Sequence, residues 1–315
     1  MLAFRPPAPL DAALTLQRYH RWGEDPAAVY RDGALYRAVR VNGTLVPCRI
    51  AVAGPPDRPR IRVTFAGADG EPVRAAVRRE TRLLLGLDSD LAGFHAHVAG
   101  DPVLGPLVAP EGGLWGLRPS VAPGGLEMLV GAISAQQVNL PFAFLTRARL
   151  VRRYGEPAAL DGVTVHAFPT AATLARADVG TLRAMQFSTR KAEYIVALAR
   201  AVDGGGLDLP ALATLPDDLV ISQLTGVRGL GRWTAEWFLA RGLGRPDVCP
   251  AGDLGVRRAV EALCFGGRPG DEARVRRRVE AWRPYRTLAV HYLLAGRRLA
   301  PGVAPPVRRA TAAGR

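Results

Sequence analysis

A glycine-rich turn between two apolar segments is the feature that most constrains this chain. Residues 224–242 read LTGVRGLGRWTAEWFLARG, with Gly226, Gly229 and Gly231 in the turn. Glycine tolerates positive φ and close backbone approach, so such a turn can bring backbone amides against a phosphate. The N-terminus of the helix that follows would add partial positive charge at the same place. A tight helix–helix turn without any ligand has the same local pattern.

Asp253 is the second informative position. It stands in PDVCPAGDLGVRR, twenty residues after Trp233, between Gly252 and the expected start of a helix. The helix N-terminus and the nearby Arg257 would favour the charged carboxylate. A charged carboxylate can stabilise an oxocarbenium ion at a sugar C1′ and orient an attacking water. The simpler alternative is a helix N-cap, worth about 1 kcal/mol.

Charge and composition narrow the class of partner. The chain has 315 residues, of which 48% are hydrophobic, with a formal net charge of +14 and a pI near 10.9. This length supports one large or two moderate domains with their own cores. The charge favours a polyanionic partner, with nucleic acid as the first candidate. A proteome that is basic throughout would give the same balance without such a partner.

Cysteine spacing and hydropathy argue against several other classes. Cys48, Cys249 and Cys264 form no C-x-x-C pair, so neither a zinc site nor an iron–sulfur cluster is expected. Their odd number and wide spacing fit reduced thiols. The chain does not start like a signal peptide and has no apolar run long enough for a membrane span. We therefore expect a cytoplasmic, nucleoid-associated protein with no membrane partner.

The hydrophobic pattern changes character along the chain. Strands are expected at 35–41, 44–53 and 60–65, with Asn42-Gly43 as a two-residue hairpin turn, and helices at 10–22, 73–87 and 88–98. After a Pro/Gly-rich connection at 102–123 the pattern is helical throughout, with helices expected at 126–137, 139–154, 170–176, 179–185, 189–202, 217–224, 233–241, 254–263, 272–282 and 284–299. The prediction is an α+β chain with a mixed α/β domain at 1–105, an all-α domain at 106–300 and a disordered basic tail at 301–315.

Several segments together resemble the helix-hairpin-helix (HhH-GPD) DNA glycosylase superfamily. The glycine turn followed by Asp253 is similar to its hairpin and Gly/Pro-Asp loop, and GAISAQQVN at 131–139 is similar to its duplex-wedge segment. STRKAEYI at 188–195 and WRPYR at 282–286 resemble two further signatures. A small antiparallel sheet before a two-lobed helical core is the organisation of bacterial 3-methyladenine DNA glycosylase II, the AlkA type. The resemblance covers nearly all of residues 1–300.

The resemblance implies that Asp253 is the catalytic aspartate. Bifunctional members place a lysine in the helix after the hairpin, where it forms a Schiff base with the sugar. Trp233 stands at that position here, and Lys191, the only lysine of the chain, lies in a different segment. Lys191 is therefore interpreted as a solvated or structural residue. We expect a monofunctional glycosylase that leaves an abasic site and has no lyase activity.

An aromatic base pocket is also implied. Trp233 and Trp237 are four residues apart on one helix and share a face. Trp282 and Tyr285 are further candidates, with a place in the core between helices as the alternative. Electron-rich rings attract a cationic alkylated base by about 0.5–2 kcal/mol each. The AlkA type has a stacking Trp in its last helix. Counting forward from the WRPYR segment, the residue at that position here is His291.

The wedge would enter the gap that a flipped base leaves in the duplex. By resemblance Gln137 is the inserted residue, with Gln136 beside it; a helix-end glutamine facing water is the alternative. Members of the family often hold a monovalent cation with hairpin carbonyls, which here would involve Leu224 and Val227. No other cofactor is expected.

The hairpin should supply most of the contacts that bind DNA. Backbone amides of Gly229 and Gly231 would meet phosphate, and Arg228 and Arg232 would add phosphate contacts. Together these features predict a monomeric enzyme that flips and excises alkylated, 3-methyladenine-type bases from double-stranded DNA in base excision repair.

Two alternatives stay open at this point. His291 makes the pocket less aromatic, which keeps open a glycosylase that acts on oxidised or deaminated bases. Tyr292 is the alternative residue at this position if the count shifts by one. A catalytically silent DNA-binding protein could keep the hairpin alone, but it would gain nothing from Asp253 near phosphate.

Overall fold

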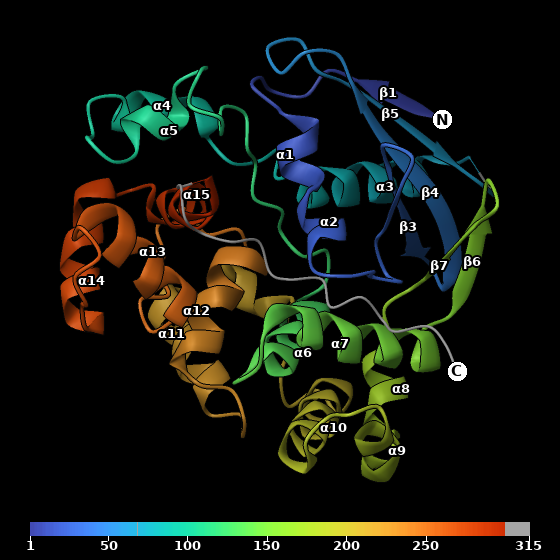
Figure 1. Ribbon diagram of the computed structural model, residues 1–315. Coiled ribbons are helices and arrows are strands. Elements are labelled where there is room, and N and C mark those ends of the chain that lie inside the picture. Colours follow the sequence, from blue (N-terminus) through green and yellow to red (C-terminus); the bar gives the residue numbers. More distant parts are fainter. Residues whose placement is uncertain (68, 300–315) are drawn as a thin grey trace, which may run out of the picture.

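A five-stranded antiparallel sheet forms the N-terminal part of the protein (Figure 1). The structure, a computed structural model, describes residues 1–67 and 69–299. The strand order is β1-β5-β4-β3-β2, with bounds Leu2–Phe4 (β1), Val29–Arg31 (β2), Ala34–Val41 (β3), Thr44–Ala53 (β4) and Arg60–Phe65 (β5). The Asn42-Gly43 turn is confirmed, because Val41 pairs with Thr44 and both turn residues have positive φ. This geometry matches the right-handed twist of the two strands it joins.

Helix α3 (Glu71–Leu84) covers one face of the sheet, with Val73, Val77 and Leu84 in the same hydrophobic cluster as the sheet residues. The helix expected at 10–22 is present as two short pieces, α1 (Ala12–Leu16) and α2 (Arg18–Arg21), which only Gln17 separates. Asp11 begins the first piece as its N-cap, accepting from the Leu14 amide at 2.8 Å.

The remainder is mostly helical, and its elements follow the expected order. They are α4 (Leu91–Val98), α5 (Gly105–Val108), α6 (Gly125–Ala135), α7 (Leu140–Tyr154), α8 (Ala171–Ala175), α9 (Val179–Ala184), α10 (Thr189–Asp203), α11 (Asp217–Thr225), α12 (Arg232–Arg241), α13 (Leu254–Cys264), α14 (Glu272–Val279) and α15 (Arg286–Leu299), with short 3-10 turns at Ala211–Thr214 and Glu280–Trp282. In Figure 1 helices α6 to α10 lie below the sheet and helices α11 to α15 lie to its left.

Between the helices expected at 139–154 and 170–176, the domain predicted to be all-α contains a β-hairpin. Strands β6 (Pro157–Leu160) and β7 (Val163–His166) pair through a turn at Asp161-Gly162, where both residues have positive φ. The all-helical prediction for this region was wrong because the alternation of Val163 and Val165 with polar residues has the period of a strand. Both valines pack in one hydrophobic cluster with Ala34, Tyr36 and Ala38 of β3.

Further contacts join the N-terminal part to the helices. Helices α4 and α5 contribute Phe94, Val98 and Val108 to the hydrophobic cluster of the helical part. On the other side Arg37 of β3 pairs with Glu127 of α6 at 2.6 Å in a buried ion pair. The limits of the two domains, 1–105 and 106–300, stay a prediction.

The basic tail predicted at 301–315 lies outside the described residues. Within residues 1–67 and 69–299, no helix has both the length and the apolar character needed to cross a bilayer.

Candidate active site and hairpin

The glycine turn joins α11 to α12 through a short hydrogen-bonded loop. The amide of Val227 donates to the Leu224 carbonyl at 3.1 Å, and the amide of Leu230 donates to the Val227 carbonyl at 3.0 Å. Gly229 has a φ of +93°, and a Cβ there would lie 2.2 Å from Cγ of Tyr194 on α10. Only glycine fits this position, since a side chain would be strained in its backbone and would overlap the tyrosine ring.

The hairpin presents unused amides beside a helix N-terminus. Among the hydrogen bonds within the described chain, none uses the amide of Gly229 or Gly231 as donor. Gly231 is the residue immediately before α12, so the positive end of that helix lies at the same place. Arg228 and Arg232 flank it with side chains that are 74% and 62% exposed. The arrangement has the donors and charge that a phosphate group requires.

Asp253 uses both of its carboxylate oxygens. Oδ1 accepts from the Val256 amide at 3.0 Å, which makes Asp253 the N-cap of α13. Oδ2 accepts from the indole Nε1 of Trp233 at 2.7 Å and of Trp237 at 3.1 Å. The capping role considered from the sequence is therefore present, but the second oxygen is held by two side chains from the helix that follows the hairpin. Three donors fix the carboxylate in one orientation.

His291 extends this group of side chains. Its ring meets the ring of Trp237 edge-on, with centroids 5.7 Å apart and an interplanar angle of 81°. Its Nδ1 lies 2.7 Å from the Thr287 carbonyl of the preceding turn of α15. Burial, together with the Arg241 guanidinium, lowers the pKa of His291 to about 3, although the contact with Thr287 acts in the opposite direction. The imidazole is therefore uncharged at neutral pH.

Two other aromatic residues from the sequence prediction lie in different surroundings. Trp282 is 1% exposed, and its indole donates to Asp101 at 2.8 Å. Tyr285 donates its hydroxyl to Asp90 at 2.7 Å. Their polar partners belong to the segment around α4 and not to the Asp253 group, so contact with a flipped base stays a prediction for both.

The alternative to His291, Tyr292, is fully buried. Its ring packs edge-on against Phe94, with centroids 5.1 Å apart, and its hydroxyl donates to the Leu117 carbonyl at 3.0 Å. Of these two neighbours in the sequence, the structure brings His291 and not Tyr292 against Trp237.

Gln136 and Gln137 lie where α6 ends, and they differ in environment. The Gln136 side chain donates from Nε2 to the carbonyl of Gly229 in the hairpin at 2.9 Å. Gln137 is exposed and has a φ of +53°. The exposed Val138 and Leu140 follow it. The structure thus places the predicted wedge segment against the hairpin, a relationship between residues ninety-three positions apart.

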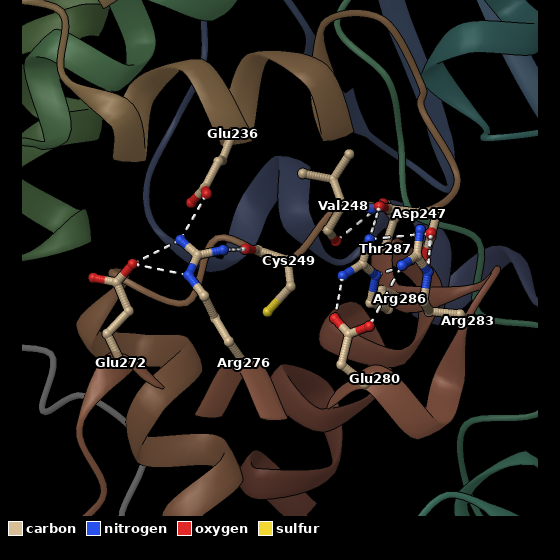
Figure 2. Close-up of polar contacts among 10 residues, drawn as sticks. All are labelled: Glu236, Asp247, Val248, Cys249, Glu272, Arg276, Glu280, Arg283, Arg286 and Thr287. Carbon is tan, nitrogen blue, oxygen red and sulfur yellow. Dashed lines mark hydrogen bonds and ion pairs between the residues drawn. The ribbon is translucent and has the colours of Figure 1, made fainter. Parts of the chain in front are cut away.

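A network of ion pairs, which sequence reasoning missed, holds the connection that leads to Asp253 (Figure 2). Arg276 of α14 pairs with Glu236 of α12 at 2.7 Å and donates to the Cys249 carbonyl at 3.3 Å. Arg286 of α15 pairs with Asp247 at 2.6 Å. Glu236 is only 4% exposed, and a single carboxylate within the otherwise uncharged segment TAEWFLA is the sequence signal that could have indicated these contacts.

Arg276 and Arg286 thus fix this connection from two helices. The backbone that carries Asp253 is attached to α14 and α15, while its carboxylate is attached to α12.

Two surface cavities lie away from Asp253. One of about 400 Å³ is lined by residues of α2, β2 and β7, including His20, Tyr30 and Thr164. The other, of about 330 Å³, is lined by residues that include Asp88, Asp90 and Arg118. Neither is lined by Trp233, Trp237 or Asp253, so the base pocket stays a prediction. In the described part of the chain no group of three or more His, Cys, Asp or Glu side chains is arranged to hold a metal ion.

The hairpin and the Asp253 loop lie within a region that matches a known protein family. Residues 130–284 match the model of the HhH-GPD superfamily base excision DNA repair proteins. DNA-3-methyladenine glycosylase 1 of Schizosaccharomyces pombe is 30% identical over 182 residues, which cover 57% of this chain and 75% of that protein. The chain belongs to the HhH-GPD superfamily.

Solved structures show the same fold. A 3-methyladenine DNA glycosylase from Archaeoglobus fulgidus aligns with a TM-score of 0.84 and 28% identity, covering 96% of this chain and 100% of that one. The Schizosaccharomyces pombe 3-methyladenine DNA glycosylase in complex with abasic DNA aligns with a TM-score of 0.55 and 28% identity, covering 64% of this chain and 95% of that one. The chain spans 56% and 50% of the length of two further curated relatives that it matches.

Proposed function

We propose that this protein is a monofunctional DNA glycosylase that excises alkylated, 3-methyladenine-type bases from double-stranded DNA. The observation that carries the proposal is the attachment of Asp253 to Trp233 and Trp237, because it holds a carboxylate against two aromatic side chains of the helix that begins at the hairpin. The names of the relatives, which are 3-methyladenine glycosylases, support the substrate class.

The hairpin would anchor the DNA backbone. The unused amides of Gly229 and Gly231, with the exposed Arg228 and Arg232 beside them, suit two oxygens of one phosphate or of neighbouring phosphates. Gln137, exposed at the end of α6, would then fill the space left by the flipped nucleotide.

Asp253 would act on the sugar. As the C1′–N bond breaks, its electron pair leaves with the base, and positive charge develops at C1′ and the ring oxygen. The carboxylate stabilises that charge and orients a water whose oxygen bonds to C1′ while its proton is released. A cationic alkylated base leaves as a neutral molecule, so no general acid is required for it.

Strand cleavage by an amine is not expected. The ammonium group of Lys191, the only lysine, donates a hydrogen bond of 2.9 Å to the Ser134 carbonyl at the end of α6. Trp233 stands at the first turn of α12 and is bonded to Asp253. Both placements support hydrolysis that leaves an abasic site.

A monovalent cation at the hairpin is a further part of the proposal. The carbonyl of Val227 accepts one amide in the turn, that of Leu230, which leaves its oxygen a second lone pair for a cation. The carbonyl of Leu224 already accepts from the amides of Val227 and Gly226, so it would bind a cation less readily. Such an ion would neutralise part of the phosphate charge. Duplex affinity at constant ionic strength, compared in potassium and in a large organic cation, tests this point. We also propose that the protein works as a monomer near the nucleoid.

Base release from alkylated duplex DNA tests the main proposal. Wild type should release bases, and strand breaks should appear only after alkali. Asp253→Asn keeps an N-cap acceptor for α13, so it should fold and bind duplex while losing release by at least about 100-fold. Tight binding without release by wild type would point to a silent binder, and breaks without alkali would overturn the monofunctional assignment.

A further inference from the structure

The end of α6 is attached at two places by side chains far away in the sequence. The Lys191 ammonium, from the first turn of α10, donates to the carbonyl of Ser134 at 2.9 Å. The Gln136 amide group donates to the carbonyl of Gly229 at 2.9 Å. The two contacts bracket Ala135, the last residue of α6, and directly precede the exposed Gln137.

Lys191 suits the C-terminus of a helix for electrostatic reasons. The last carbonyls of a helix have no partner within it and carry partial negative charge. An ammonium that donates to one of them satisfies that oxygen and interacts favourably with the helix dipole. In the described chain Lys191 forms no ion pair with a carboxylate, so Ser134 is its polar partner. Burial lowers the pKa of Lys191 from its usual value, which agrees with a half-buried position.

The same first turns of α10 also contact the hairpin. Tyr194, three residues after Lys191, lies under Gly229 closely enough that a Cβ on that glycine would overlap its ring. Glu193 pairs with Arg228 at 3.6 Å. Helix α10 therefore contacts the wedge segment through Lys191 and the hairpin through Tyr194, while Gln136 joins the wedge segment to the hairpin directly.

We infer that Lys191 is a positioning residue for base extrusion, which sets the direction of Gln137 relative to the phosphate-anchoring hairpin. Gln136 helps to position Gln137 through its hydrogen bond to the hairpin, and only Gln137 enters the duplex. The inference rests on the proposed function of the same site. It assigns a role to the single lysine and gives the two adjacent glutamines different roles. Gln136 is bonded to the hairpin, whereas Gln137 is exposed in a left-handed backbone conformation.

The positive φ of Gln137 explains why such an attachment is needed. A non-glycine residue in this region is held there by its surroundings, since the conformation costs of the order of 1 kcal/mol. Without Lys191 and Gln136 the turn after α6 could relax, and the glutamine would no longer be presented in one direction. The loss should affect extrusion of a paired base and not the chemistry at Asp253.

Two substrates separate extrusion from chemistry. One is a duplex with a single N-alkylated purine in a normal pair, and the other carries the same lesion in a one-nucleotide bulge, where no partner has to be replaced. Lys191→Met should slow single-turnover release from the paired duplex by about tenfold, the equivalent of one charge-assisted hydrogen bond. The ratio of the paired rate to the bulge rate should fall by the same factor. Lys191→Arg should restore it.

A matched control exists on the same helix. Arg200 also donates to a carbonyl, that of Ala175, at 3.1 Å, but at the opposite end of α10. Arg200→Met should leave the ratio of paired to bulge rates unchanged. Gln136→Met removes the other attachment and should lower the ratio as Lys191→Met does, which provides a second variant if the first unfolds.

A double mutant shows whether Lys191 acts through Gln137. Gln137→Ala should lower the same ratio, and adding Lys191→Met to it should cause no further loss, because residues in one pathway are not additive. Equal slowing on both substrates, or additive losses, would overturn the inference.

Failure of the proposed function can be distinguished from failure of this inference. If wild type releases no base from either substrate, the substrate class is wrong. In that case unstacking is followed by the fluorescence of 2-aminopurine next to an uncleavable abasic analogue in duplex DNA. A fluorescence rise with wild type and Arg200→Met but not with Lys191→Met supports the positioning role, and equal rises with all three overturn it.

Discussion

The indole nitrogen of Trp233 donates to Oδ2 of Asp253 at 2.7 Å, across twenty residues of sequence. This contact attaches the Asp253 carboxylate to the first turn of α12, whose N-terminus is the hairpin. The distance between a DNA phosphate bound at the hairpin and the Asp253 carboxylate would therefore be fixed. A shift of about 1 Å in such a geometry can cost about 100-fold in rate.

Trp233→Phe tests this attachment. It keeps an aromatic ring but removes the donor, so base release should slow by about tenfold, the value of a hydrogen bond to a charged group. Duplex affinity should change little. Single-turnover release and a binding titration measure the two effects. Trp237→Phe, which removes the longer 3.1 Å contact, is the comparison and should slow release less. An unchanged rate in Trp233→Phe would contradict the prediction.

Gly255→Ala should disturb Asp253 from the other side. A Cβ at this position would lie 2.9 Å from Oδ1 of Asp253, closer than real Cβ contacts allow, so the carboxylate has to shift. Alanine is also a better helix former than glycine by about 1 kcal/mol, so stability should be kept within about that amount. We expect slower base release with a nearly unchanged melting temperature. A rate equal to wild type would mean that the carboxylate position is not critical.

Gly229 and Gly231 of the hairpin should respond differently to substitution. Gly229→Ala combines positive φ with overlap of the Tyr194 ring, so the hairpin should distort and the protein lose about 2–3 kcal/mol of stability. A Cβ at Gly231 meets no atom within 4 Å. Gly231→Ala should therefore fold normally yet bind duplex DNA more weakly, because the methyl group hinders close approach of a phosphate. Denaturant unfolding and salt-dependent DNA titrations separate the two results. Equal stability losses would refute this distinction.

His291 should make stability depend on pH. Its pKa is about 3 in the folded protein, through burial and the neighbouring Arg241, and the unfolded value is the ordinary 6.5. A lowered histidine pKa contributes stability that is complete above 6.5 and is lost as pH falls toward 3. Arg18 and Arg298 also face this ring and act in the same direction as Arg241.

Between pH 7.5 and pH 5 the free energy of unfolding should therefore fall less in His291→Phe than in wild type. The difference between the two decreases should reach up to about 2 kcal/mol. His95, whose pKa burial lowers to about 4, is present in both proteins and cancels in the comparison. Urea unfolding at the two pH values measures the difference. Parallel losses in the two proteins would show that the His291 pKa is not lowered.

Local patterns determined most of the secondary structure. The Asn42-Gly43 turn and the bounds of β4 and β5 follow from residues that are close together in the sequence, and the structure has them as expected. The hairpin at 157–166 could have been predicted as well, since Asp161-Gly162 is a turn of the same kind between alternating residues. It was missed because the surrounding pattern is helical.

The sequence also pointed to the residues of the candidate site: the glycine turn, Asp253 after it, and a hairpin without lysine. Only the tertiary structure decided which side chains meet. It bonds Trp233 to Asp253, places Trp282 against Asp101, and ties Gln136 to Gly229 across ninety-three residues. The physical reason is that turns and helices depend on backbone preferences and periodicity over a few residues. The partner of a side chain instead depends on how whole helices pack, which no local pattern specifies.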